Sequence, residues 1–168
     1  THLKNIEILI ASDVGPGNCL IDLVMTEKFK MPFDNKGENA SKGKINQNFL
    51  DMLLSKSSGM NYPRADDKQD YYKLLDNSFR DISSNIILRT VTEFTALKMK
   101  DFYDFCEKPE EVIIHGGGTR NIFLMGLIKD KISGIVKTTK DKIPSQFVES
   151  AGFAYLAYLK KGELFLSK

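Results

Sequence analysis

The chain has 168 residues, of which 42% are hydrophobic, and this length and composition suffice for one domain with a hydrophobic core. Its 24 lysine and arginine residues nearly balance its 22 aspartate and glutamate residues, so the net charge of +2 gives no electrostatic basis for binding nucleic acid or an anionic membrane. No segment approaches the roughly 20 consecutive apolar residues of a transmembrane helix, so we expect neither nucleic-acid nor membrane partners.

The first predicted elements are a strand and a helix joined by a glycine-rich turn. Residues 6–11 (IEILIA) form an apolar run that is typical of a buried strand, and residues 15–17 (Gly-Pro-Gly) follow it. Asn18 is a suitable N-cap, and the apolar residues after it repeat at helical spacing. Residues 30–44 are polar and contain one proline and two glycines, so we predict a loop there.

Three helices are predicted between residues 45 and 106, a segment that we interpret as a helical insertion. We expect them at residues 49–54, 67–79 and 82–106, because apolar side chains recur there at intervals of three and four. Pro109 ends the third of these segments.

The remainder of the chain alternates between strands and helices. We predict a strand at 112–114, a glycine turn at 116–118, a helix from Asn121, a strand at 134–138 and a helix from Ser145. This alternation is typical of an α/β fold with a central sheet.

We expect that sheet to be a single mixed sheet flanked by helices. Strand 6–11 and strand 112–115 should both belong to it. Because each strand feeds a helix through a glycine turn, the two turns should then open at the same edge of the sheet.

Two of these turns carry residues with alternative roles. Asp13 leaves the end of the first strand, where its carboxylate could cap the turn or act in a site. Gly116, Gly117 and Gly118 could simply make a tight strand-to-helix connection, or they could let a ligand approach the backbone near a helix N-terminus. Asn121 could cap that helix or contact a ligand. From the sequence pattern alone, Glu149 on the last helix is interpreted as a solvent-exposed acid.

The two cysteines, Cys19 and Cys106, lie far apart and have no histidine or cysteine neighbours at metal-ligand spacing. We therefore predict buried free thiols in a reducing, cytoplasmic compartment and no metal site made by the protein alone.

Taken together, three stretches resemble motifs of the anhydro-N-acetylmuramic acid kinases. They read "SDVGPGNCLID", "HGGGTRNIFLMGLI" and "TTKDKIPSQFVESAGFAYLA". The corresponding motifs in the second half of that family are F-D-T-G-P-G-N-x-L-[IL]-D, G-G-G-x-x-N-x-x-L-M and T-T-D followed by E-A-x-A-F-A-x-L-A. The resemblance runs from about Ile8 to the end of the chain, and "FDNKGENASKGKIN" adds a fourth similar segment.

The resemblance implies the actin-like sugar-kinase fold, in which two lobes close on ATP and Mg²⁺. Residues 1–168 would form one C-terminal lobe, because the family's G-T-S-M-D-G phosphate loop, which belongs to the N-terminal lobe, is absent from this chain. The implied reaction opens the 1,6-anhydro ring of 1,6-anhydro-N-acetylmuramic acid with water and phosphorylates the released 6-hydroxyl, a step of cell-wall recycling.

The resemblance also implies roles for individual residues. Asp13 would be the general base for the attacking water. The nucleotide would contact Gly116, Gly117, Gly118 and Asn121, and the sugar would contact Gly15, Asn18 and Glu149.

The chain also departs from the family pattern, which leaves two rival functions open. Val14 replaces a threonine, and residues 63–70 read "PRADDKQD" where the family has P-K-S-T-G-R-E. The first rival is a non-catalytic reduced or split relative that binds a nucleotide or a partner lobe. The second is another actin-like sugar kinase. We expect no turnover from these residues alone, and the partners left open are a separately encoded N-terminal lobe and a second copy of the chain.

Overall fold

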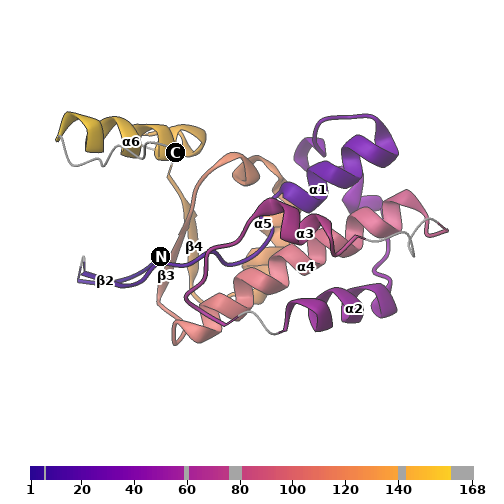
Figure 1. The fold of residues 1–168 in the computed structure, drawn as a ribbon, viewed down its shortest axis with the longest axis horizontal. Helices are drawn as coiled ribbons and strands as arrows, with labels where there is room; N and C mark the ends of the chain where they lie inside the picture. Colours follow the sequence, from indigo (N-terminus) through magenta and orange to yellow (C-terminus); the bar gives the residue numbers. More distant parts are fainter. Residues whose placement is uncertain (6, 59–60, 76–80, 140–142, 160–168) are drawn as a thin grey trace, which may run out of the picture.

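A long central helix organises the fold. The computed structural model describes residues 1–5, 7–58, 61–75, 81–139 and 143–159. Helix α4 (Ser84–Phe105) lies at the centre of the helical body (Figure 1), and three other helices pack against it: α1 (Cys19–Val24), α2 (Gln47–Ser57) and α5 (Ile122–Lys131). The predicted long helix is thereby confirmed, and it forms the middle of the core.

Helix α4 can be buried along most of its length because its threonine side chains form hydrogen bonds within the helix itself. The hydroxyls of Thr90, Thr92 and Thr95 each donate to the carbonyl oxygen four residues earlier, at 2.7–3.0 Å. The apolar stripe between them packs into one cluster with the neighbouring helices. Its fully buried members include Leu20, Ile21, Phe49, Leu53, Leu88, Val91, Phe94 and Ile128.

The α/β class is confirmed by a strand–helix–strand unit near the end of the chain. Strand β3 (Glu111–Ile114) and strand β4 (Ile135–Thr138) pair in parallel, with Glu111 opposite Ile135 and Ile114 opposite Thr138. Helix α5 connects them and packs on α4. The predicted glycine turn lies at the carboxyl end of β3, the end of a parallel strand where ligands bind in α/β folds.

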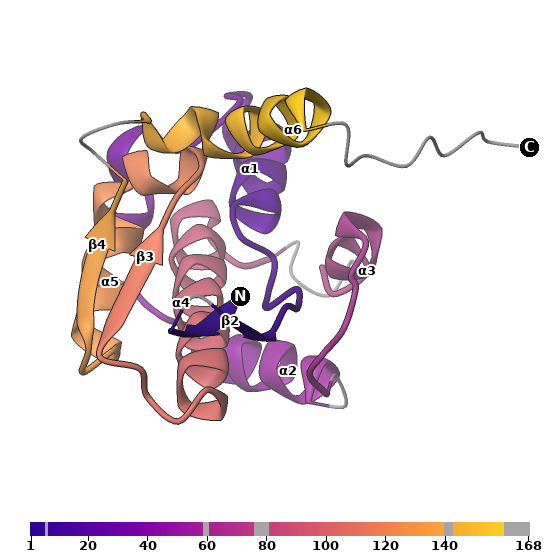
Figure 2. The same cartoon turned by 90° about the vertical axis from the view of Figure 1, so that its left-hand side faces the viewer.

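The single mixed sheet that we predicted is not formed in the described part of the chain. Strand β1 (His2–Lys4) and strand β2 (Glu7–Ile10) make an antiparallel pair of their own, separate from β3 and β4. Figure 2 shows this hairpin lying crosswise to the β3–β4 pair. The prediction that strands 6–11 and 112–115 share a sheet was therefore wrong, because β2 takes β1 as its hydrogen-bonding partner and a cavity separates β1 from β3.

The prediction of a buried first strand was also wrong. Ile8 and Leu9 in β2 are 67% and 53% exposed. An apolar sequence becomes buried only where a second layer covers it, and within the described residues the hairpin has no such layer on its β2 strand.

The remaining helices follow the predictions with shifted ends. Helix α2 contains the predicted segment 49–54. Helix α3 (Lys68–Tyr72) is shorter than predicted, since residues 73–75 form turns and 76–80 lie outside the described residues. Helix α6 (Val148–Tyr158) begins after a short 3-10 turn (Ser145–Phe147). The interpretation of residues 45–106 as an insertion stays a prediction.

Candidate functional site

The two glycine turns meet in space although their strands do not share a sheet. Asn18 ends the first turn, and its Oδ1 lies 3.3 Å from the position that a Cβ on Gly118 would occupy. This oxygen is buried and has no hydrogen-bond partner in the described structure. A buried amide oxygen normally has a partner, so the contact between the turns leaves an acceptor available to a water or a ligand donor.

The first turn is fastened to helix α4. Thr95 Oγ1 lies 3.2 Å from the carbonyl oxygen of Gly17, which shares the single hydroxyl proton with the carbonyl oxygen of Val91, and Gly17 has the positive φ of 54° that suits glycine. A Cβ on Gly15 would stand 2.8 Å from Cβ of Lys98 on the same helix, closer than two such atoms approach. Gly15 therefore has a packing reason to be glycine, and its predicted sugar contact stays a prediction.

Asp13 lies just before this turn with an exposed side chain. Its Oδ2 accepts a hydrogen bond of 2.8 Å from the backbone N–H of Asp66. Within the described residues, Oδ1 of Asp13 accepts no hydrogen bond. One oxygen is thus fixed by the protein, while the other can accept a proton or a hydrogen bond from a ligand.

The second turn contains one glycine for which the fold gives no reason. Gly116 needs its positive φ of 91°, and its N–H donates to the carbonyl oxygen of Ser145 at 2.7 Å. Gly117 has no positive φ, and a Cβ there would meet nothing within 4 Å. Open space beside an unconstrained glycine is the arrangement that lets a ligand approach the backbone.

Asn121, which we predicted to contact the nucleotide, has a structural role in the fold. Its Oδ1 accepts a hydrogen bond of 3.0 Å from the N–H of Leu124, which caps α5, and the residue is only 5% exposed. It also lies against Gly37, where a Cβ would approach Oδ1 to 2.3 Å. Asn121 holds the helix and the loop after α1 together, while its contact with a nucleotide stays a prediction.

Glu149 lies near the start of α6, and its side chain is exposed. In Figure 1, α6 stands apart from the helical body, with no buried residue along it. Among the described residues no hydrogen bond or ion pair joins Glu149 to either glycine turn, and its role toward a sugar stays a prediction.

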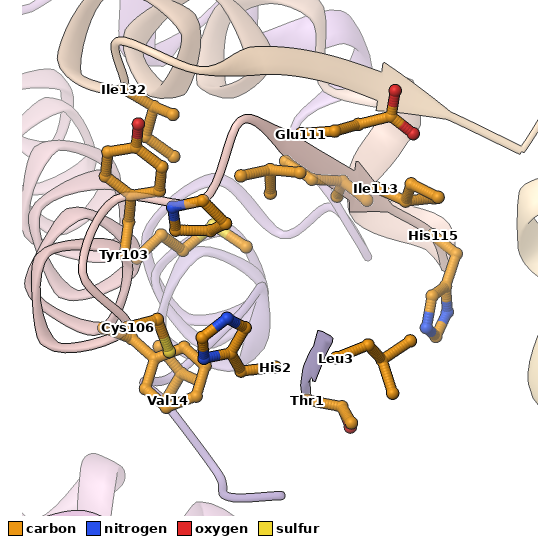
Figure 3. Close-up of a pocket in the computed structure, with 15 residues that line it drawn as sticks. Thr1, His2, Leu3, Val14, Tyr103, Cys106, Glu111, Ile113, His115 and Ile132 are labelled. Atoms are coloured by element: carbon orange, nitrogen blue, oxygen red, sulfur yellow. The ribbon is translucent and has the colours of Figure 1, made fainter. Parts of the chain in front are cut away.

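A separate cavity of about 480 Å³ lies between the hairpin and β3 (Figure 3). Thr1, His2 and Leu3 form one wall, and β3 with the residue after it (111–115) forms the other. Tyr103 of α4 and Cys106, which directly follows α4, also line the cavity. The eight predicted site residues all lie in the described part of the chain, and none of them lines this cavity. The cavity lies between the two sheets, and it is not the predicted site.

The sequence analysis missed Arg64 and Asp66, whose backbone groups hydrogen-bond to Asp13, and Tyr71, whose hydroxyl bonds to the side chains of both. Arg64 Nη2 donates to the carbonyl oxygen of Val14 at 2.7 Å, next to Asp13. The available signal was the segment 63–70, which matches the family block in position but carries different charges.

The described residues contain no group of three or more histidine, cysteine, aspartate or glutamate side chains placed to hold a metal ion. Both cysteines are free thiols, and burial raises the pKa of Cys19 to about 11. None of the helices in the described part of the chain has the length and hydropathy to cross a membrane.

Comparison with known proteins decides the family. The family model "Anhydro-N-acetylmuramic acid kinase" matches residues 2–164, almost the entire chain. The chain belongs to this family.

Three relatives, each an anhydro-N-acetylmuramic acid kinase by name, show the extent of the similarity. The protein of Caldanaerobacter subterraneus subsp. tengcongensis is 34% identical over 168 aligned residues, which cover 91% of this chain and 42% of that protein. The Rhodopseudomonas palustris protein is 31% identical, with 94% and 43% covered. A Bacillus cereus protein is 33% identical, with 92% and 44% covered. The chain therefore spans less than half the length of these curated relatives.

Proposed function

We propose that the chain is the C-terminal lobe of an ATP-dependent kinase with the actin-like fold. Its substrate is 1,6-anhydro-N-acetylmuramic acid, which it hydrolyses and phosphorylates together with an N-terminal lobe. The observation that carries the proposal is the contact between Asn18 and Gly118, because it joins the predicted sugar-side and nucleotide-side turns at one place.

In this proposal Asp13 is the general base. Water attacks the anomeric carbon and gives its proton to the free oxygen of the Asp13 carboxylate. The bond between that carbon and the bridging oxygen breaks, and the bridging oxygen accepts the γ-phosphoryl group of ATP as ADP leaves. A carboxylate with one fixed and one free oxygen suits this step, because the base must be oriented and still able to take a proton.

The glycine turn at residues 116–118 suits the nucleotide, and Asn18 Oδ1, which has no partner among the described residues, suits the sugar. The open space at Gly117 would accept the phosphates of the nucleotide, and Asn18 Oδ1 would accept a hydrogen bond from a sugar hydroxyl. ATP supplies the phosphoryl group, and Mg²⁺ would be bound through its phosphates, as is usual for this ion.

The test is a chimera in which this chain replaces the matching region of the Caldanaerobacter relative. We expect ADP formation that depends on the anhydro sugar. Asp13→Asn should lower turnover by about 10²–10⁴-fold, since general-base catalysis is lost. It should melt within a few degrees of the parent chimera, because the amide oxygen of asparagine can still accept from Asp66.

Either of two results would contradict the proposal. A folded chimera with no sugar-dependent turnover would favour the non-catalytic relative that binds a nucleotide or a partner lobe. An Asp13→Asn variant that keeps most of its turnover would show that the carboxylate only supports the turn.

A further inference from the structure

The strand end that carries Asp13 is paired with a distant segment of the chain. The backbone N–H of Asp13 donates to the carbonyl oxygen of Arg64 at 2.9 Å. In return, the N–H of Arg64 donates to Ser12 Oγ, also at 2.9 Å. These bonds join positions 51 and 52 residues apart, respectively, so the placement of Asp13 depends on how the segment around Arg64 is held.

That segment is held by a nearly buried ionic network. Arg64 Nε donates to Asp66 Oδ2 at 2.9 Å, and the two side chains are only 9% and 12% exposed. The guanidinium group also donates to Val14 O at 2.7 Å and to the hydroxyl of Tyr71 at 3.2 Å, and it lies 5.1 Å from the ring centroid of Tyr62. A planar guanidinium group can serve all of these partners at once, which a lysine ammonium cannot.

Tyr71 is the third side chain of the network, and it bonds to both Arg64 and Asp66. The residue is 3% exposed, and its hydroxyl donates to Asp66 Oδ2. Burial, together with this hydrogen bond, raises the pKa of Tyr71 above its ordinary value of 10, so the hydroxyl keeps its proton. Asp66 is therefore held from two sides, by Arg64 and by Tyr71.

The network acts on the Asp13 carboxylate through one backbone group. With the Asp66 side chain fixed, the N–H of Asp66 points at Asp13 Oδ2 at 2.8 Å. This hydrogen bond selects one orientation of the carboxylate and leaves Oδ1 without a protein partner among the described residues. A small misplacement of a catalytic group can cost about 100-fold in rate, so such an orientation matters for a general base.

We propose that Arg64 is a positioning residue for Asp13, acting through Asp66 and Tyr71. This inference rests on the proposed role of Asp13 as the general base. Arg64 does not touch the reacting atoms; it fixes the segment whose backbone orients the carboxylate. The network belongs to this chain's own residues 63–71, where the sequence departs from the family block.

The chain offers a matched control in a second arginine of the same kind. Arg89 Nη1 donates to Glu93 Oε2 at 2.7 Å, and its guanidinium lies 5.1 Å from the ring centroid of Phe123. The side chains of this pair are 13% and 8% exposed, close to the values of Arg64 and Asp66. Replacing either arginine with lysine disturbs a similar ion pair, but only Arg64 is linked to Asp13.

The experiment follows the backbone amide signal of Asp66 by ¹⁵N–¹H NMR in the full chain during a pH titration. The part of its pH response that disappears in Asp13→Asn reports the hydrogen bond to the Asp13 carboxylate. We expect Arg64→Lys to abolish this part and Arg89→Lys to keep it. Tyr71→Phe, which removes a single hydroxyl, should reduce it, and this variant decides the question if Arg64→Lys does not fold.

The proposal is overturned if the response survives intact in Arg64→Lys, or if Arg89→Lys loses it to the same extent. If Tyr71→Phe is the deciding variant, an unchanged response overturns it. The measurement needs no substrate and no second lobe. An intact network in a chimera without turnover would contradict the proposed function alone, while a loss of turnover in Asp13→Asn with no effect of Arg64→Lys on the amide would contradict the positioning role alone.

Discussion

The residues of the candidate site differ in the physical reason for the residue type at each position. Gly15 is a packing requirement, since a methyl group there would collide with Lys98. Asn121 is a structural residue, since it caps α5 from a buried position. Gly117 has neither reason, because its φ is ordinary and open space surrounds it. Residues that the fold does not require are the better candidates for ligand contact.

Two glycine substitutions test this distinction. Gly117→Ala should change the free energy of unfolding by no more than about 0.5 kcal/mol, as for a surface substitution, and should raise the KM for ATP in the chimera. Gly15→Ala should lower the free energy of unfolding by about 1–3 kcal/mol, because the added methyl overpacks the contact with Lys98. Urea denaturation and steady-state kinetics measure the two effects. If Gly117→Ala is the less stable variant, Gly117 is a structural residue.

At the scale of elements, helices α4 and α5 are joined by a buried carboxylate with two cationic partners. Glu93 on α4 is 6% exposed and pairs with Arg89 one turn earlier and with Lys131 at the end of α5. Burial raises the pKa of Glu93, but hydrogen bonds from Lys131 and Arg89 outweigh it and hold the pKa below its ordinary value of 4.5. The pair of helices that supports the second glycine turn therefore depends on an ionised group.

Glu93→Gln should lower the free energy of unfolding by about 3 kcal/mol at neutral pH, because it leaves buried cationic partners without their charge. A carboxylate with a lowered pKa in the folded state contributes its stabilisation fully above its unfolded pKa and loses it as the pH falls through the folded value. The difference between wild type and variant should therefore shrink below about pH 4.5. Urea denaturation over this pH range measures it.

The control for this prediction is Glu27→Gln, which changes an exposed glutamate in the same way and should have little effect. A Glu93→Gln effect that is the same at every pH would mean that the network stabilises by packing and not by charge.

At the scale of the whole molecule, several apolar surfaces are left uncovered in the described part of the chain. In α6, Phe153, Tyr155 and Tyr158 are 61–80% exposed, and Leu3 and Ile8 of the hairpin are exposed as well. Contiguous exposed apolar surface commonly marks an interaction site. These surfaces accord with the proposal that an N-terminal lobe accompanies this chain in the active enzyme.

The 168-residue chain by itself should give no sugar-dependent ADP formation. Phosphoryl transfer depends on positioning and on neutralising charge around the phosphates, and this chain lacks the G-T-S-M-D-G phosphate loop. An ATPase assay with the anhydro sugar measures this, and a full-length relative under the same conditions is the control. Turnover clearly above background would show that this chain alone assembles the site.

The sequence by itself determined the family, the α/β class and most of the helices. Local signals are sufficient for these features. Asn121 before an apolar repeat predicts the start of α5, and the stripe along residues 82–106 predicts α4, because capping and helical periodicity depend on neighbouring residues alone. The motifs around Gly117 identified the family because their residue types and spacing are specific in combination.

Only the tertiary structure decided which segments lie together. The sequence did not show that β2 would take β1 as its partner, because strand pairing depends on which edge is available in space. Nor did it show that Arg64 would bond to residues some 50 positions earlier, since long-range contacts leave no periodic signal in either segment. The meeting of Asn18 with Gly118 has the same origin: both turns are fixed by their packing on α4 and α5, and that packing exists only in the folded chain.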